Sequence, residues 1–287
     1  MKFPTILLVA IVSLLSPSSA YAEINFGESI EWVTADSDRV IVGKVVKVET
    51  VAGHEVATVE VTKTLRGKHE PKATFVLRSY HGGVAKDWLD AGVPMLFFLR
   101  TREHTKDADK LPKGYDWVLR DDGNYPSVVA LDKAGRGMDV FTREFGMLTD
   151  KAAILKHIEA YAKSIPADWK KQSIQFHAPG DSAVFEKLWA GSAVVFTLPV
   201  DAQLEVQGRR WCKSDDVGIR ARGAKVLGNF KNDENIKLLR SLLQDPGFYT
   251  GDGMRRYVAR AAAYEVLRGF GIEVPRPVLE QPAAGAK

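Results

Sequence analysis

Six histidines are the first side chains in this sequence that could do chemistry, by holding a metal ion. Zinc sites place their ligands at tight spacings, such as two histidines four residues apart on a helix or a pair of nearby cysteines. No such spacing occurs among His54, His69, His81, His104, His157 and His177. The first three fall in loops between expected strands and could meet in space, but surface histidines are the favoured interpretation. The sequence therefore predicts no metal site and no cofactor.

Gly180-Asp181-Ser182 resembles the nucleophile block of one group of esterases. A serine nucleophile needs a base to activate it, and in that group a D-x-x-H pair supplies the base. The sequence contains no D-x-x-H, no G-x-S-x-G elbow, no phosphate-binding loop and no dinucleotide fingerprint. Asp181 and Ser182 more simply cap a helix over 183–189. We therefore expect no catalytic residue, and an exported hydrolase is the least favoured function.

Cys212 is the only cysteine in the chain. An exported protein with one cysteine cannot form an internal disulfide, so its stability must come from packing. Cys212 follows Trp211 on an expected helix, and the favoured interpretation is a buried, small apolar residue rather than a reactive thiol.

The first 22 residues have the pattern of a cleaved signal peptide. Lys2 gives a positive start, residues 6–15 are apolar, and Ala20-Tyr21-Ala22 is a small-x-small cleavage pattern. An apolar run of this length rises about 15 Å as a helix, which is half of a roughly 30 Å hydrocarbon core. No later run is long enough to cross a membrane. We expect export and a periplasmic or secreted mature chain without a membrane span.

Residues 39–131 have the period of strands. Apolar and polar residues alternate over 57–65 and 73–77, and residues 39–49 are rich in β-branched side chains, with Gly43 as an expected bulge. Residues 93–99 are a continuous apolar run, typical of a strand covered on both sides. Short strands are expected at 117–119 and 128–131, and a short helix at 29–35. Five or six strands in about a hundred residues favour a small closed barrel.

The period becomes helical near residue 149. Thr149 or Asp150 can cap a helix that should end before Pro166, because the residue before proline avoids the helical region. Alternation at 174–176 and 194–198 then indicates two strands. Residues 136–200 are therefore expected to form a connecting α+β module.

From residue 201 the chain is expected to be helical and to repeat itself. When the sequence is shifted by forty residues, RARGAKVLGNF over 220–230 lies on RAAAYEVLRGF over 260–270. A small residue takes the same place in both copies, Gly223 and Ala263, where two helix axes can approach closely. Each copy is preceded by another apolar helix, and the period lies in the range of stacked helix pairs.

Two family resemblances follow from these segments. Residues 201–272 resemble HEAT repeats, through their paired helices, an Asp-Pro after a first helix and the Val-x-Arg-Ala-Ala of a second. Residues 28–132 resemble the OB-type barrel of tissue inhibitors of metalloproteinases and netrin modules, through ADSDRVIVGKVVKVE, VEVTKTLRGK and AGVPMLFFLR. These resemblances imply a secreted five-stranded barrel used in protein contacts and a short solenoid of helix pairs.

The sequence departs from the inhibitors at one decisive point. In that family a cysteine at the mature N-terminus chelates the zinc of the target enzyme. Here the expected mature start is Glu23, and no cysteine precedes Cys212. This mechanism is therefore not carried over.

The expected fold class is α+β and multidomain: a small antiparallel OB-like β-barrel, a connecting α+β module and a short α-solenoid of HEAT-like helix pairs. The expected divisions are a signal peptide at 1–22, the barrel at 23–135, the connecting module at 136–200, the helical repeats at 201–273 and a flexible tail at 274–287.

Charge argues against a nucleic-acid partner, because 13 Lys and Arg face 10 Asp and Glu over 201–273, which is no concentrated basic stripe. We expect an exported, non-enzymatic interaction or scaffold protein whose partner is another envelope or extracellular protein. The candidate protein-binding residues are Arg209, Arg210, Arg255 and Arg256. The alternative is a secreted peptidase inhibitor or modulator that acts through the barrel loops.

The signal-peptide pattern makes a testable prediction. The mature protein should begin at Glu23 and occur in a soluble extracytoplasmic fraction, because the apolar run before it is too short to anchor it. Mass spectrometry of the N-terminal peptide in each cell fraction checks this. Membrane-bound protein that still carries residues 1–22 would contradict it.

Overall fold

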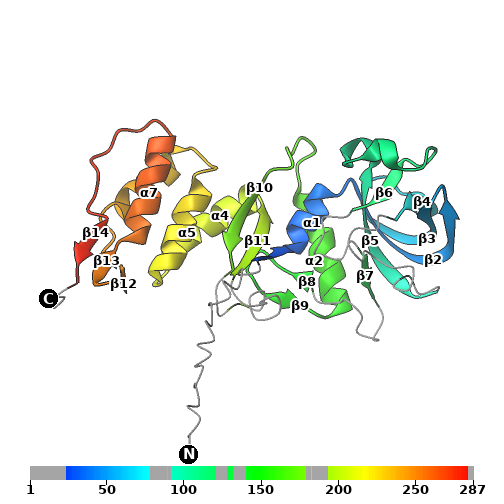
Figure 1. Cartoon of the computed structure of the whole chain (residues 1–287), viewed down its shortest axis with the longest axis horizontal. Helices are drawn as coiled ribbons and strands as arrows, with labels where there is room; N and C mark the ends of the chain where they lie inside the picture. The colour runs from blue at the N-terminus through cyan, green and yellow to red at the C-terminus, as the bar shows by residue number, and fades with distance from the viewer. Residues whose placement is uncertain are drawn as a thin grey trace, which may run out of the picture.

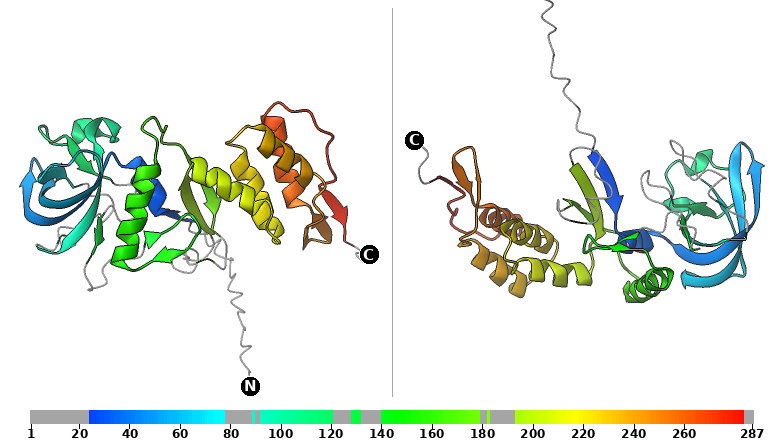
Figure 2. Two further views of the ribbon diagram at one scale, coloured as in Figure 1. Left: turned by 180° about the vertical axis from the view of Figure 1, so that it is seen from behind. Right: turned by 90° about the horizontal axis from the view of Figure 1, so that it is seen from below.

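The computed structural model describes residues 24–77, 89, 92–120, 128–131, 140–178, 182 and 193–283. The expected signal peptide, His81, Asp181 and the helix at 183–189 lie outside these residues. A β-barrel, a central α+β part and a group of helices follow one another along an elongated molecule (Figure 1, Figure 2). Every helix in the described ranges is too short or too polar to cross a bilayer.

Five strands close the barrel, in the order β2 (Arg39–Val51), β3 (His54–Arg66), β4 (Lys72–Val76), β6 (Trp117–Leu119) and β5 (Pro94–Thr101). β5 pairs back onto β2 and completes the ring, and β7 (Val128–Ala130) pairs with β5 beside β6. The expected small closed barrel is confirmed. Its expected antiparallel character is wrong, because β4 and β6 run parallel. A ring of five strands cannot alternate direction throughout, so at least one pair must be parallel.

Strand β5 of the barrel is covered on both faces. Met95, Phe97 and Leu99 of β5 pack inside the barrel. Leu96 and Phe98, on the opposite face, pack with the helices of the central part. The apolar run of residues 93–99 is therefore continuous because both faces of the strand are covered, as expected.

Gly43 marks an irregularity in β2, as expected. The pairing of β2 with β3 shifts register between Val42 and Gly43. A Cβ atom at this position would collide with Val59 and with the carbonyl oxygen of Glu60. Only glycine allows the two strands to come this close here.

The central part contains α1, α2 and a three-stranded sheet. Its elements are β1 (Ile24–Glu28), α1 (Ile30–Asp36), β8 (Val140–Phe141), β9 (Met147–Leu148), α2 (Lys151–Ser164), β10 (Ser173–His177) and β11 (Ala193–Pro199). β11 pairs in parallel with β1 and antiparallel with β10. Residues 24–36, within the expected barrel range, therefore lie outside the closed ring.

Side-chain caps begin the two helices of the central part. The Ser29 hydroxyl accepts a hydrogen bond from the Trp32 N–H at 3.1 Å, and the Asp150 carboxylate accepts one from the Ala153 N–H at 2.8 Å. Such caps satisfy backbone donors that the first helical turn leaves unpaired. α2 ends at Ser164, before Pro166, as the sequence predicts.

Acidic side chains in and beside α1 form a buried ionic network. Arg120, fully buried, donates to both carboxylate oxygens of Glu28 and, through Nε, to Asp36 at 2.8 Å. Arg100 of β5 also pairs with Asp36. These contacts join the sheet of the central part, α1 and the barrel.

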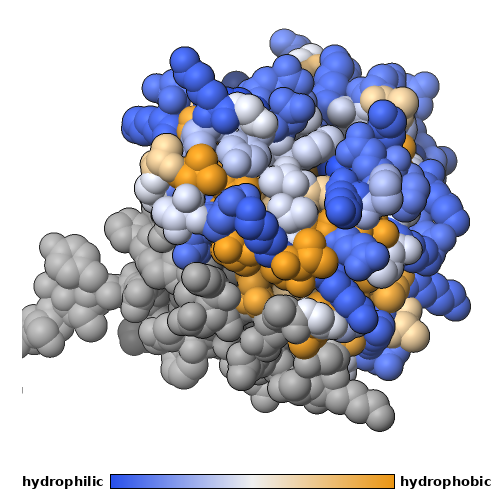
Figure 3. Space-filling model, turned by 90° about the vertical axis from the view of Figure 1, so that its right-hand side faces the viewer, coloured by the Kyte–Doolittle hydropathy of each residue, from blue (hydrophilic) through white to orange (hydrophobic). Residues whose placement is uncertain are grey.

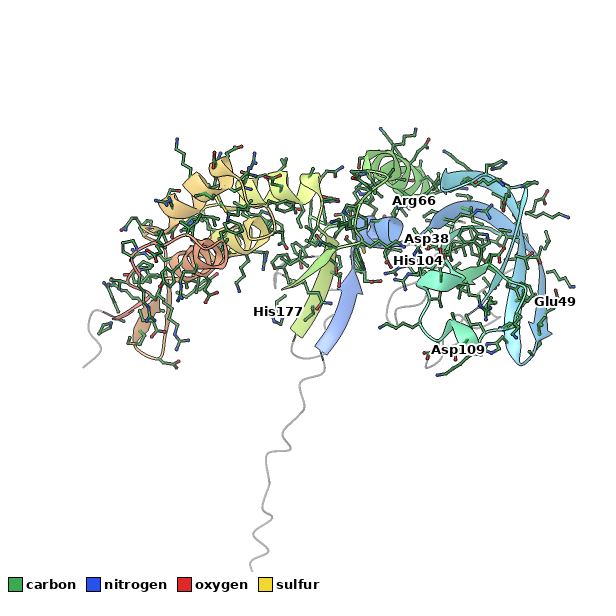
Figure 4. The ribbon with its side chains drawn as sticks, turned by 90° about the horizontal axis from the view of Figure 1, so that it is seen from above. Asp38, Glu49, Arg66, His104, Asp109 and His177 are labelled. Atoms are coloured by element: carbon green, nitrogen blue, oxygen red, sulfur yellow. The ribbon has the colours of Figure 1, made fainter. Side chains whose placement is uncertain are left out.

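Two further acids extend this network. Glu31, 1% exposed, lies 2.7 Å from His157 Nε2 of α2 and accepts from the Arg143 N–H. Asp38, just after α1, accepts from Lys171 Nζ at 2.7 Å and from the Thr101 N–H at 2.8 Å, and it contacts His104. Figure 4 shows Asp38, His104 and Arg66 gathered where α1 meets the barrel.

The helices after residue 200 pack in pairs, as the repeat predicts. They are α4 (Ala202–Trp211), α5 (Val217–Leu227), α6 (Asp233–Leu242) and α7 (Val258–Gly269). α4 packs on α5, α6 packs on α7, and α5 packs on α7. Arg143 forms a two-pronged ion pair with Asp201, the cap of α4, at 2.8 and 2.9 Å, which fixes α4 to the central part.

The repeated small residues lie at close helix contacts, as expected. A Cβ atom on Gly223 would lie 2.6 Å from Cys212 N and 2.7 Å from the Gly208 carbonyl oxygen, so α4 and α5 approach through backbone. Ala263, fully buried, packs in the cluster that joins α5, α6 and α7. Cys212 is buried as well, and burial raises the pKa of its thiol to about 12. The thiol is therefore protonated at neutral pH and unreactive.

A small sheet follows the helices. β12 (Tyr249–Gly251) and β13 (Met254–Arg256) form a hairpin, and β14 (Glu280–Pro282) pairs with β13. The described part of the range expected to be a flexible tail thus includes a paired strand. Residues 271–279 connect α7 to β14, and we call them the strap.

The buried position of Ala263 predicts a cost for a larger side chain. Ala263→Leu forces three extra heavy atoms into a packed layer, and overpacking costs about 1–3 kcal/mol. Gly223→Leu should also destabilise, although replacing a helical glycine usually gains about 1 kcal/mol. Urea denaturation measures both changes.

Glu265, which is exposed on α7, supplies the matched control. Because leucine and glutamate have similar helix propensities, Glu265→Leu should change the free energy of unfolding by no more than about 0.5 kcal/mol. Equal midpoints for the Ala263 and Glu265 variants would contradict the assigned contact.

The Asp38 contacts predict a pH-dependent stability. Burial alone would raise the pKa of this carboxyl, but the hydrogen bonds from Lys171, the Thr101 N–H and His104 lower it from 3.8 to about 2. The stabilisation is therefore fully present above about pH 4 and is lost as pH falls towards 2. Asp38→Asn should lower the free energy of unfolding by about 1–2 kcal/mol at pH 7 and by progressively less between pH 4 and pH 2. Urea midpoints across this range test it, and a loss that does not vary with pH would contradict it.

Candidate protein-interaction surface

The β12–β13 hairpin positions the candidate surface. Asp252 and Gly253 have φ of +51° and +68° and join the strands in a two-residue turn, with Gly251 paired to Met254. Tight turns with positive φ at both central positions match the twist of paired strands and favour Asp-Gly. The turn therefore fixes how Arg255 and Arg256 are presented.

Two aromatic rings and two arginines form a continuous cluster beside this hairpin. We call it the Phe248 cluster; its members are Phe248, Arg255, Tyr257 and Arg260. The Arg255 guanidinium lies 4.7 Å from the centre of the Phe248 ring, and Phe248 meets Tyr257 edge-on at 5.8 Å. Arg260 stacks on the other ring, 3.9 Å from the centre of Tyr257. Phe248 is 39% exposed, whereas Tyr257 is buried.

Hydrogen bonds of Tyr257 and Arg260 hold the Phe248 cluster in place. Arg260 Nε donates to the Asp245 carbonyl oxygen at 2.6 Å, and the Tyr257 hydroxyl donates to Gln281 of β14 at 2.8 Å. Asp245 is itself held by a two-pronged pair with Arg220 of α5, at 2.6 and 2.9 Å. Arg220 and Arg260 are equivalent residues of the two repeats, so the repeat itself fixes this surface.

The expected site residues Arg255 and Arg256 lie together on β13. Arg255 is half-buried under its contact with Phe248. Arg256 is half-exposed and pairs with Asp252 at 3.1 Å and with Glu280 at 3.6 Å. Arg255 is therefore the one of the two whose contacts within the described residues include no carboxylate.

The other expected site residues, Arg209 and Arg210, lie elsewhere, on α4. Arg209 bridges helices: it pairs with Glu205 and with Glu234 at 2.6 Å and donates to Asn235 at 2.7 Å. Arg210 is more exposed and pairs with Glu144 of the β8–β9 connection. The two pairs of arginines are at opposite ends of the helical part, α4 beside β10 and β11 and the hairpin near the C-terminus (Figure 1). The structure does not bring the four together.

The histidines of the described ranges do not assemble. His54 begins β3, whereas His69 follows the end of that strand. Figure 4 shows His104 beside the barrel and His177 on the far side of α1, on β10. Among the residues that the structure describes, no group of three or more His, Cys, Asp or Glu side chains could hold a metal ion.

The arrangement of the Phe248 cluster suits contact with another protein. Exposed aromatic and arginine side chains carry much of the binding energy in protein interfaces, because they combine large apolar area with directed hydrogen bonds. A guanidinium stacked on an aromatic ring keeps its N–H groups available at the ring's edge. Because the cluster is already held by hydrogen bonds, binding would cost little side-chain ordering.

The barrel end has a different surface. Hydrophilic side chains dominate the face that Figure 3 shows, and hydrophobic ones gather beside residues outside the described part. Val46 of β2, 55% exposed, is a large hydrophobic residue of the barrel that faces solvent.

Comparison of the chain with known protein families, with curated proteins and with solved structures gave no match. The candidate surface therefore rests on its own geometry.

Proposed function

We propose that this chain is an exported, non-enzymatic protein that binds another envelope or extracellular protein. The observation that carries the proposal is the Phe248 cluster, a partly exposed, hydrogen-bonded set of aromatic and arginine side chains at the end of the molecule remote from the barrel. Its binding element is the C-terminal helical part with its small sheet.

The helical part is proposed to be a short HEAT-like solenoid. Two helix pairs stack, and the small residues at equivalent positions of α5 and α7 are both packed against other helices: Gly223 lies against α4, and Ala263 packs in the cluster that joins α5, α6 and α7. Stacked repeats of this kind present extended surfaces for partners. The barrel, by its likeness to the inhibitor and netrin modules, would be a second module for protein contacts.

Export supports the choice of partner. The proposal takes residues 1–22 as a signal peptide, which would place the mature chain with envelope or extracellular proteins. The buried, protonated Cys212 fits a compartment in which exposed thiols are oxidised.

Site-specific photo-crosslinking tests the proposal. Benzoylphenylalanine is introduced in place of Phe248 in the full-length chain, which is expressed in its native cells, irradiated and isolated, and adducts are identified by mass spectrometry. We expect a discrete protein adduct from position 248. Adding Arg255→Glu should lower its yield about tenfold, since interface arginines commonly contribute more than 1 kcal/mol.

Position 46 supplies the matched control and tests the alternative. Val46 is also exposed but lies on the barrel, so benzoylphenylalanine there should form no such adduct. A peptidase adduct from position 46, with none from 248, would overturn the proposal in favour of a modulator that acts through the barrel. Lys68→Glu, a charge reversal in a barrel loop, should leave the yield at 248 unchanged.

A further inference from the structure

The outer face of α7 lacks the covering that the same face of α5 receives. In α5, Val217, Ala221 and Ala224 pack in the cluster shared with α6 and α7. The equivalent residues forty positions later are Tyr257, Ala261 and Tyr264. No further helix follows α7 among the described residues; the strap runs beside this face, and β14 contacts it at Tyr257.

Two hollows lie along the seam between α7 and the strap. The first hollow, of about 530 Å³, is lined on the helix side by Tyr257, Val258 and Ala261 and on the strap side by Arg276, Pro277 and Leu279. The other, of about 660 Å³, is lined by Tyr264 and Arg268 and by residues 271–275. Both volumes lie in the range of sites that hold small ligands or short peptides.

The strap is attached to α7 at its two ends. The Ile272 N–H donates to the Leu267 carbonyl oxygen at 3.0 Å, and the Tyr257 N–H donates to the Leu279 carbonyl oxygen at 2.9 Å. Pro275 and Pro277 flank Arg276 between these attachments. Proline has no N–H and keeps the residue before it extended, so the strap cannot form a helix or a continuous strand over this seam. The hollows therefore follow from the sequence of the strap.

Arginines without carboxylate partners border the hollows. Arg276 is exposed and makes no hydrogen bond or ion pair with any described residue. Arg268 is exposed and contacts the Tyr264 ring at 5.8 Å, without an ion pair in the described ranges. The nearby acids are Glu280, which pairs with Arg256, and Glu273. The seam thus joins a floor of mixed polar and apolar side chains to two guanidinium groups that can each hold a carboxylate.

We infer that this seam binds a short, extended peptide of the partner that alternates apolar and acidic side chains. From Val258 to Arg268 the helix rises about 15 Å, which matches four to five residues of extended chain at about 3.3 Å each. An extended chain fits better than a further helix, because Tyr257 and Tyr264 replace the smaller Val217 and Ala224, which in α5 pack in the cluster shared with α7. The inference rests on the proposed function and names the chemistry of its partner.

Fluorescence anisotropy with a defined probe tests the inference. The full-length chain, freed of any tag, is titrated into fluorescein-labelled Val-Glu-Leu-Asp-Leu with a free C-terminus, and into the amidated analogue Val-Lys-Leu-Lys-Leu. We expect binding of the acidic probe only. Arg276→Glu should weaken it about tenfold or more, because a charged hydrogen bond is replaced by repulsion. Ala261→Phe should abolish it by filling the floor.

Arg240→Glu is the matched control, because Arg240 is exposed on α6 and lines neither hollow. It should change the affinity less than twofold. Equal losses for the Arg276 and Arg240 variants, or equal binding of the two probes, would overturn the inference. Dimerisation of the chain that Ala261→Phe abolishes would overturn it too, by assigning the seam to a second copy. Adducts from position 248 without probe binding refute this inference alone, whereas absence of adducts refutes the proposed function.

Discussion

The pairing of buried carboxylates around α1 is the constraint on which the arrangement of the molecule depends. A carboxylate withdrawn from water must be neutralised and hydrogen-bonded, and removing one partner of a buried pair typically costs about 3–5 kcal/mol. Glu28, Glu31 and Asp36 meet this requirement with partners from separate elements. Arg120 follows β6, Arg100 lies on β5, and Arg143 and His157 come from the central part. Rotation of the barrel against the central part would therefore expose these charged side chains to solvent or separate them from their partners.

This constraint continues into the helices. Arg143, whose backbone N–H holds Glu31, uses its guanidinium to hold Asp201. Asp201 also caps α4 and accepts from Tyr161 of α2 at 2.7 Å. The pKa of Tyr161 is well above its ordinary value, first through burial and then through the Asp201 charge, so this hydroxyl remains a donor at any physiological pH. A single chain of contacts thus runs from α1 to the first helix of the repeats.

Local periodicity predicted most of the elements, because each signal lies within a few neighbouring residues. Alternation predicted β3 and β4, β-branched composition predicted β2, and a continuous apolar run predicted β5. The forty-residue repeat predicted the stacked helices, and a proline marked the end of α2. The pairing of β1 with β11 could not be predicted in this way. The two strands are more than 160 residues apart in the chain, and no local pattern shows that they pair in parallel.

The candidate surface likewise combines features that local sequence signals predict with features that depend on tertiary contacts. Arg209 was predicted to bind a partner, but it bridges α4 and α6, a contact that no local pattern encodes. The hairpin at 249–256 did have a local signal, since Asp252-Gly253 is a favoured turn pair. Phe248 and Tyr257 flank that hairpin, so its recognition would have pointed to the cluster. The stacking of Arg255 on Phe248 required the structure.

The two repeats differ in the size of the side chains on one face of their second helices, α5 and α7. On one face of α5, Val217 and Ala224 are small and pack in the cluster that includes residues of α7. At the equivalent face of α7, tyrosines stand in both places, and a third helix pair could not approach to the same distance without overpacking. A stack of helix pairs needs a cover for its last apolar face. Here the cover is the proline-containing strap, which is narrower than a helix and leaves the seam hollow. The tyrosines that stand at these two places therefore also line the two hollows beside the strap.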